Sequence, residues 1–278
     1  MARRFVFTIT TGRSGTAYLA ELFKQNLTDA AVWHERTGFT TFGVDAPDLS
    51  HFTLFNSRGN VSRVNEFWRG KFDRDLQTPT TIHAETSHLL AKAGLLENIE
   101  MLLAKGGQIE VVVLKRDVFD TLWSFYNRFD FVKNGLAWAF YLDAAYPNVI
   151  VDSEPFLEHG AAGKALWYIF EMRARGTDDR RLLDDQHGVR FHEANLEDIA
   201  DVDAGQTLLT DMYMLPARGV TCPAARNTIP FQFFGEDERK KLRRFCDQFS
   251  FEEEAAASAA AFLERGRRLG EGPATARK

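Results

Sequence analysis

The chain has 278 residues, of which 45% are hydrophobic and 13% aromatic, enough for the core of a single α/β domain over residues 1–269. Its formal net charge of −5 lacks the basic excess typical of nucleic-acid-binding proteins, and no apolar run is long enough to span a membrane. Two cysteines and an N-terminal apolar run too short for a signal peptide predict a cytoplasmic protein.

The first predicted element is a strand over residues 5–9, followed at once by a polar loop that contains two glycines. A helix follows the loop, because the apolar side chains at 18, 19, 22 and 23 share one stripe. Glycines permit tight turns that aim successive backbone N–H groups at one anion, and Arg and hydroxyl side chains add donors. The order therefore predicts an anion-binding loop, whose members are Gly12, Arg13, Ser14, Gly15 and Thr16. The alternative is an ordinary strand–turn–helix connection.

The loop differs from the P-loop of nucleoside-triphosphate-binding proteins. That motif ends in Gly-Lys-Ser/Thr, where the lysine reaches the terminal phosphates and the hydroxyl holds Mg²⁺. Here Gly15 and Thr16 are adjacent, and the only cation of the loop, Arg13, precedes the second glycine. A standard ATP or GTP site is disfavoured.

The middle of the chain contains a second cluster of the same kind. Residues 38–80 show weak periodicity and predict a long excursion over the sheet edge, and residues 81–88 end another predicted core strand. The run Glu110–Leu114 predicts a strand buried on both faces of a parallel sheet. It leads into Arg116 and Asp117, a suitable helix N-cap, with Ser124 about two turns further along. Arg116 and Ser124 are placed to bind a second phosphate, because ligands of open α/β sheets bind where the strands end.

The rest of the chain carries fewer signals. Residues 161–187 and 236–266 predict helices, and residues 270–278 predict a mobile tail.

The two clusters together resemble the sulfotransferases that use 3′-phosphoadenosine-5′-phosphosulfate (PAPS). In that family a T-x-[RK]-S-G-T loop holds the 5′-phosphosulfate, and it matches residues 11–16. A later R-[DN]-P segment, followed by Ser and Tyr, holds the 3′-phosphate. The matching residues are Arg116, Asp117, Ser124 and Tyr126, with Val118 in place of the usual proline. Residues 189–196 are similar to a late structural strand of the family, so the matches span residues 5–196.

The resemblance implies a three-layer, P-loop-like α/β fold and an enzyme that passes a sulfuryl group from PAPS to a hydroxyl or amine, releasing 3′-phosphoadenosine-5′-phosphate (PAP). Arg13 would meet the charge that develops on the leaving phosphate oxygen. The family's bacterial carbohydrate and tyrosylprotein members use a Glu after the first helix as general base, which implies Glu35. Cytosolic members use a His at a strand end, which implies His83 as the second candidate, and His34 stands next to Glu35.

Each candidate base has a structural alternative. Glu35 is also interpretable as a solvated loop acid paired with Arg36, and His83 as a hydrogen-bonded structural histidine. Neither His34-Glu35 nor His83-Ala84-Glu85 has a recognisable zinc spacing, so no metal is expected.

Two other functions stay open at this stage. One is a nucleotide-dependent phosphotransferase with a degenerate P-loop, in which Asp117 would hold Mg²⁺. The other is a non-catalytic nucleotide-binding protein. No motif identifies the acceptor, which could be a small molecule, a carbohydrate or a peptide. The oligomeric state is not predicted by any motif either.

Overall fold

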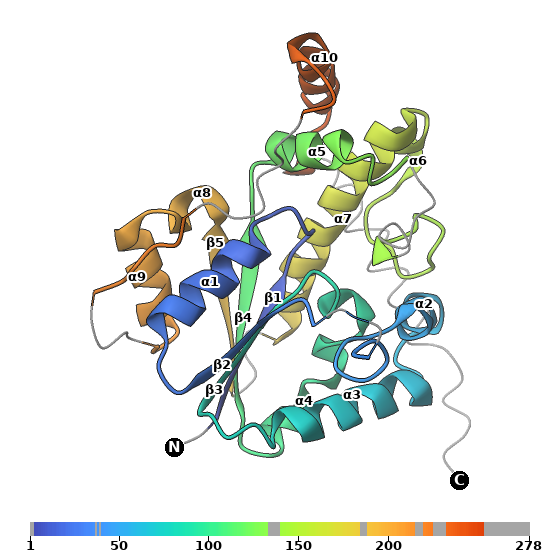
Figure 1. Cartoon of the computed structure of the whole chain (residues 1–278). Helices are drawn as coiled ribbons and strands as arrows, with labels where there is room; N and C mark the ends of the chain where they lie inside the picture. Colours follow the sequence, from blue (N-terminus) through green and yellow to red (C-terminus); the bar gives the residue numbers. More distant parts are fainter. Residues whose placement is uncertain are drawn as a thin grey trace.

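A computed structural model of the chain describes residues 3–36, 38, 40–132, 140–183, 188–214, 219–224 and 232–252 (Figure 1). The predicted tail over residues 270–278 lies outside these ranges.

A five-stranded parallel sheet forms the centre of the molecule. Its strand order is β2-β3-β1-β4-β5. The strands are β1 (Arg4–Ile9), β2 (Ala30–His34), β3 (Ile82–Thr86), β4 (Gln108–Lys115) and β5 (Val189–Asn195). The two central strands, β1 and β4, are buried on both faces, which explains their almost continuous apolar sequences. Because all strands are parallel, their carboxyl ends lie along one edge of the sheet.

Helices cover both faces of this sheet (Figure 1). One face packs against α1 (Thr16–Asn26), α8 (Leu196–Ile199) and α9 (Val202–Asp211). The other face carries the larger core, built with α2 (Leu49–Arg58), α3 (Ser62–Asp75), α4 (Glu100–Leu103), α5 (Val118–Asn127), α6 (Glu154–Leu157) and α7 (Gly160–Leu183). Successive residues of β1 divide between the two cores, with Phe5 and Phe7 on one face and Val6 on the other. The predicted three-layer α/β fold is confirmed.

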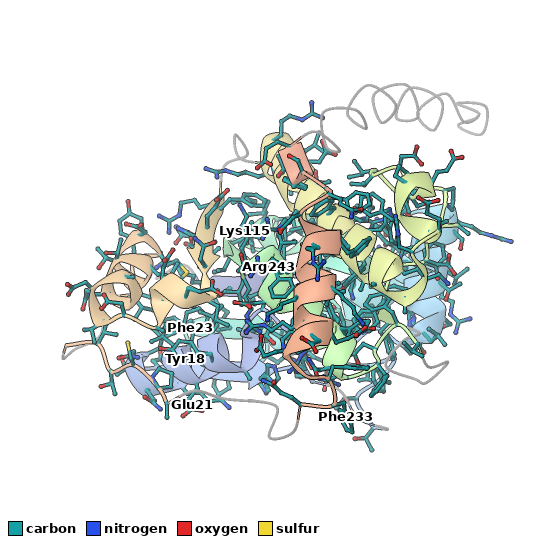
Figure 2. The ribbon with its side chains drawn as sticks, turned by 90° about the horizontal axis from the view of Figure 1, so that it is seen from above. Tyr18, Glu21, Phe23, Lys115, Phe233 and Arg243 are labelled. Carbon is teal, nitrogen blue, oxygen red and sulfur yellow. The ribbon has the colours of Figure 1, made fainter. Side chains whose placement is uncertain are left out.

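Two short 3₁₀ helices, η1 (Ala91–Ala93) and η2 (Leu96–Asn98), connect β3 to α4. At the other end of the described chain, α10 (Glu236–Cys246) packs on α5, where the Arg243 guanidinium lies 3.6 Å from the centre of the Phe119 ring (Figure 2). None of the helices in the described ranges is both long and apolar enough to cross a membrane.

Three regions differ from the sequence predictions. The excursion over residues 38–80 contains two regular helices, α2 and α3, which bury aromatic rings against the sheet. The edge strand β2 was not predicted, because all five of its residues are only half buried and give no alternating pattern. The helix predicted over residues 236–266 ends at Cys246, within its described part.

Candidate functional site

The predicted anion loop joins β1 to α1 at the carboxyl edge of the sheet. Three of its residues, Gly12, Arg13 and Gly15, have left-handed backbones with φ of 79°, 58° and 94°. A Cβ built on Gly15 would lie 2.4 Å from Cδ1 of the half-buried Leu196, so a side chain here would have to displace Leu196 and also adopt a positive φ. The loop's left-handed residues give it the form of a backbone concavity that receives an anion.

The hydroxyl groups of the loop are buried and hold its shape. Thr11 Oγ1 lies 2.6 Å from Ser14 Oγ, and Ser14 Oγ also donates to Gly12 O at 3.1 Å. Thr10 Oγ1 is buried without a hydrogen-bond partner among the described residues, which leaves one donor for a ligand. Gly15, the N-cap of α1, supplies no side-chain cap, and the first turn contains no acidic residue. The positive end of the helix dipole is therefore open to an anion.

The second predicted cluster meets the first. Arg13 Nε donates to Ser124 Oγ of α5 at 3.0 Å, and Arg116 Nη1 donates to Arg13 O at 3.2 Å. Asp117 is the N-cap of α5, as predicted, and its Oδ1 accepts from Asp120 N at 2.9 Å. The structure thus brings Arg13, Arg116 and Ser124 together, although they are far apart in the sequence.

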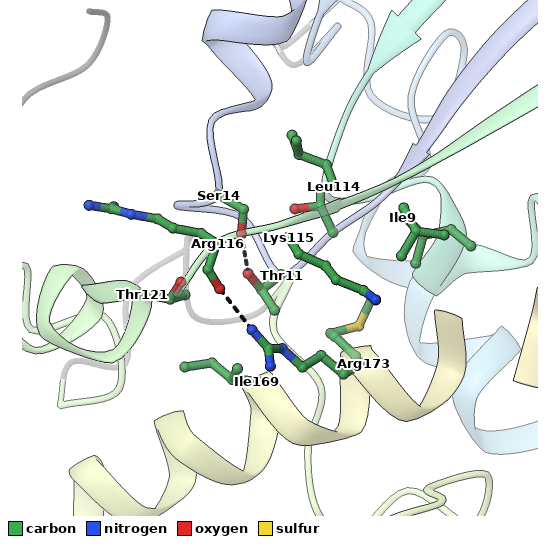
Figure 3. A pocket seen from close by; sticks show the side chains of 12 residues that line it. Ile9, Thr11, Ser14, Leu114, Lys115, Arg116, Thr121, Ile169 and Arg173 are labelled. Carbon is green, nitrogen blue, oxygen red and sulfur yellow. Dashed lines mark hydrogen bonds between the residues drawn. The ribbon is translucent and has the colours of Figure 1, made fainter. Parts of the chain in front are cut away.

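Arg173 of α7 also contacts this cluster, and no motif in the sequence predicts it. Its Nη2 donates to Arg116 O at 2.8 Å (Figure 3). It lines a small cavity of about 20 Å³ together with Arg116, Thr11 and Ser14 (Figure 3). Arg173 therefore fixes the backbone from which Arg116 extends.

The environment of Arg13 is strongly charged. Burial lowers the pKa of its guanidinium, Arg128 and Arg116 lower it further, and Asp130 opposes them. Arginine keeps its charge in proteins, so these groups concentrate positive charge beside the loop. An anionic ligand would relieve the repulsion between them.

Glu35 lies directly after β2, at the same edge of the sheet. Its backbone is left-handed, with φ of 43°, and its N–H donates to Thr86 O at 3.0 Å. Glu35 Oε1 is 3.8 Å from His34 Nε2 and 3.7 Å from His88 Nε2. His34 Nε2 is in turn 3.0 Å from Thr16 Oγ1, at the start of α1. The predicted base therefore lies beside the anion loop, with two imidazole rings within 4 Å of its carboxylate.

Both imidazoles are biased toward their neutral forms. Burial lowers the pKa of His34, while Glu35 opposes this shift. Burial also holds the pKa of His88 well below its usual value, and the nearby Lys92 adds to the effect. A Cβ on Gly12 would lie 3.3 Å from His88 Cγ, so the His88 ring packs directly on the loop. His88 belongs to the predicted strand-end segment 81–88, but the sequence did not distinguish it from His83.

His83, the second candidate base, occupies a different place. It pairs with Phe5, near the amino end of β1, and its side chain is fully buried. Its ring packs on Trp33, with centroids 4.6 Å apart, and its Nε2 lies 3.6 Å from Asp75 Oδ2. The structure does not bring His83 to the edge that carries Arg13 and Glu35.

The residues Asp75, His83 and Glu85 offer ligand atoms within 4.8 Å of one another. A cation of the chain itself already lies among them, because Lys71 Nζ is 2.6 Å from Glu85 Oε2 and 3.0 Å from Asp75 Oδ2. The cluster is therefore a buried ion network in which the Lys71 ammonium occupies the position a metal would take.

No protein-family model and no curated protein sequence matches the chain. Solved structures with a similar fold include a sulfotransferase from Alicyclobacillus acidocaldarius, at 14% identity over 95% of this chain and 97% of that chain, with a TM-score of 0.43. Another is the sulfotransferase domain from the curacin biosynthetic pathway, at 13% identity over 76% of this chain and 72% of that chain, with a TM-score of 0.37. At these identities and TM-scores, neither structure identifies the family of this chain.

Proposed function

We propose that the protein is a sulfotransferase that transfers the sulfuryl group of PAPS to a hydroxyl or amine acceptor. The observation that carries the proposal is the direct contact between the two anion clusters, in which Arg13 binds Ser124 while Arg116 binds the Arg13 carbonyl. A nucleotide with phosphate groups at both its 3′ and 5′ positions needs two such clusters side by side.

The residues present fit this cofactor. The left-handed loop, the unpartnered Thr10 hydroxyl and the uncapped start of α1 suit the 5′-phosphosulfate. Arg116 and Ser124 would hold the 3′-phosphate. Bound there, PAPS supplies an activated sulfuryl group.

The chain's own residues then have distinct tasks. Arg13 and the backbone N–H groups of the loop stabilise negative charge on the phosphate oxygen of the leaving nucleotide. Glu35 accepts the proton of the acceptor group, which makes that group a better nucleophile. His34 and His88 flank the carboxylate at 3.8 Å and 3.7 Å. Sulfuryl transfer needs little covalent help, so positioning and charge stabilisation supply most of the rate.

Calorimetric binding of PAP tests the cofactor assignment, with ATP–Mg²⁺ as the control ligand. We expect the wild-type chain to bind PAP in the micromolar range and the Arg116→Ala variant to bind it at least tenfold more weakly. A matched surface variant, Arg63→Ala on the exposed side of α3, should bind like wild type.

The alternatives predict other results. Preference for ATP–Mg²⁺ would favour the phosphotransferase, although the Asp117 carboxylate that would hold the ion already accepts a hydrogen bond as a helix cap. Binding of PAP without sulfate transfer to any acceptor would favour a non-catalytic protein. The acceptor class and the cytoplasmic location stay predictions.

A further inference from the structure

A fully buried lysine lies behind the proposed base. Lys92, in η1, has no exposed surface, and its Nζ lies 5.1 Å and 5.4 Å from the ring centres of Tyr168 and Tyr141. Burying an ammonium is costly unless each of its N–H groups has a hydrogen-bond acceptor. Burial lowers the pKa of Lys92 well below its usual value, and the negative charge of Glu35 opposes this shift. The acceptors around Lys92 therefore decide whether it keeps its charge.

Three acceptors surround Lys92 Nζ, one for each N–H of an ammonium. They are Phe140 O at 2.6 Å, Tyr168 Oη at 2.8 Å and His88 Nδ1 at 3.1 Å. Tyr168 gives its own proton to Thr11 O, at 2.9 Å, so its oxygen must accept from Lys92. As an ammonium, Lys92 directs two N–H groups to Phe140 and Tyr168 and the third to the ring of His88. As a neutral amine it would present a lone pair to His88 Nδ1 instead, and the direction of that hydrogen bond would be reversed.

This third hydrogen bond determines where His88 carries its proton. If Nδ1 accepts from the Lys92 ammonium, a neutral imidazole must hold its single proton on Nε2. Nε2 is the atom that lies 3.7 Å from Glu35 Oε1. The proton then faces the carboxylate at a separation longer than a direct hydrogen bond, so the attraction between them is electrostatic. In the other tautomer a lone pair would face the carboxylate and repel it.

We propose that Lys92 and His88 are positioning residues for Glu35: the Lys92 ammonium fixes the Nε2–H tautomer of His88, and His88 Nε2–H orients the Glu35 carboxylate beside the anion loop. The role in catalysis rests on the proposed function, while the tautomer and the carboxylate interaction do not. Lys92 also donates to the Tyr168 hydroxyl, which in turn donates to the Thr11 carbonyl. One buried cation is thus connected both to the base and to the loop.

The charges around His88 are consistent with a neutral ring. Cations face it from several elements: Lys92 in η1, Arg13 in the loop and Arg128 after α5. Glu35 supplies the nearby negative charge, and burial disfavours the imidazolium. A neutral donor can bind the carboxylate without taking the place of the proton that Glu35 must accept.

Nitrogen NMR of the full chain tests the tautomer directly. Long-range ¹H–¹⁵N spectra distinguish Nδ1–H from Nε2–H in each of the seven histidines, and a His88→Gln variant assigns the signal. We expect wild-type His88 to be neutral and protonated on Nε2 at pH 7. In Lys92→Met, which removes the ammonium but keeps the volume, we expect the Nδ1–H form to appear. An Nδ1–H tautomer in the wild type would overturn the proposal.

A matched pair of variants tests the effect on Glu35. His88→Gln keeps an N–H donor near the Nε2 position, whereas His88→Leu removes it. Carbon NMR of the Glu35 carboxyl group at pH 7, assigned with Glu35→Gln, should give a chemical shift near the wild-type value in the Gln variant and a displaced chemical shift in the Leu variant. Equal shifts in both variants would overturn the positioning role, whatever their stability.

Kinetics separate this proposal from the proposed function. If the wild type transfers sulfate, His88→Leu should lower kcat about 10²-fold with little change in KM, and His88→Gln should recover most of the loss. Equal kcat losses in both variants would contradict the role in catalysis. If the wild type transfers no sulfate, the proposed function fails, and the two NMR measurements still decide the tautomer and the carboxylate interaction.

Discussion

Arg13 meets two demands that usually fall on different residues. Its backbone is left-handed, with φ of 58°, a conformation that costs a non-glycine residue about 1–2 kcal/mol. Its side chain donates from Nε to Ser124 Oγ at 3.0 Å, which leaves the two terminal nitrogens of the guanidinium for other acceptors. Glycine would adopt this backbone conformation at a lower free-energy cost than arginine. A strained non-glycine residue of this kind is typical of functional sites.

A series at position 13 separates the two demands. Arg13→Gly should leave the free energy of unfolding equal to wild type or higher, because glycine tolerates positive φ, yet lower kcat/KM for sulfate transfer about 10²–10³-fold. Arg13→Lys should recover only part of the activity, because lysine lacks the forked donors. Urea unfolding and steady-state kinetics on the same preparations provide the measurements. Full activity in Arg13→Gly would contradict the role of the guanidinium.

Glu35 makes a separate prediction about chemistry rather than binding. Glu35→Gln keeps the shape and removes the proton acceptor, so turnover should fall about 10²–10⁴-fold. PAP affinity should stay within about twofold of wild type, because the anion clusters are intact. The matched control is Glu66→Gln on the exposed side of α3, which should leave both quantities unchanged. Wild-type turnover in Glu35→Gln would assign the base elsewhere.

At the scale of elements, the loop between β1 and α1 is held both by its own hydrogen bonds and by a contact with α8. Leu196, the first residue of α8, occupies the space next to Gly15. A side chain at position 15 would therefore displace Leu196 or move the start of α1 away from the end of β5. The segment over residues 189–196 is interpreted from its sequence as structural. This contact shows that its last residue, Leu196, packs against the anion loop.

Gly15→Ala should lower the free energy of unfolding by more than the strain of its positive φ alone. A variant with the same strain but open space, Gly106→Ala at φ 78°, provides the baseline, because nothing lies within 4 Å of its Cβ. We expect Gly15→Ala to exceed this baseline by about 1–3 kcal/mol, the usual cost of overpacking. Adding Leu196→Ala to the Gly15→Ala variant should restore part of the lost free energy of unfolding. Additive effects in this double-mutant cycle would show that the two residues do not interact.

At the scale of the whole molecule, the partly buried histidines His34 and His88 couple stability to pH. The folded pKa of His88 lies well below that of the unfolded chain, about 6.5, and the folded pKa of His34 is also lowered. The unfolded chain therefore binds these protons first as the pH falls. Stability should be at its full value above about pH 6.5 and should decrease as the pH drops below it.

Urea unfolding at several pH values between 5 and 7.5 measures this slope. His88→Gln removes one of the titrating groups, so its stability should vary less steeply with pH than that of the wild type. Titration of His34 and of carboxylates affects both proteins alike and cancels in the difference. An identical slope in the two proteins would mean that His88 has the same pKa in the folded chain as in the unfolded chain.

Local sequence predicted the central part of this molecule well. The strands β1 and β4 are apolar runs that end in a glycine-rich loop or a capping residue, and each signal lies within a few residues of the chain. The helices α2 and α3 were missed because their mixed polar sequences become amphipathic only against this particular sheet.

The site was predictable where it depends on short motifs and not where it depends on tertiary approach. Arg13, Arg116 and Ser124 belong to two local patterns, and the parallel sheet brings both to one edge. The sequence did not show which of His83 and His88 lies at the site. Their positions depend on the strand register and on the approach of η1. Arg173 reaches the site from a long helix with no motif of its own.

The contact between Gly15 and Leu196 also has a consequence for the divergence of this chain. Two positions that share one small volume are not free to mutate independently, since a gain of bulk at one must be matched by a loss at the other. Among distant relatives, we expect a larger residue at position 15 to accompany a smaller one at position 196. Such paired substitutions would identify the end of the anion loop in related sequences, even where the motif residues of the loop have changed.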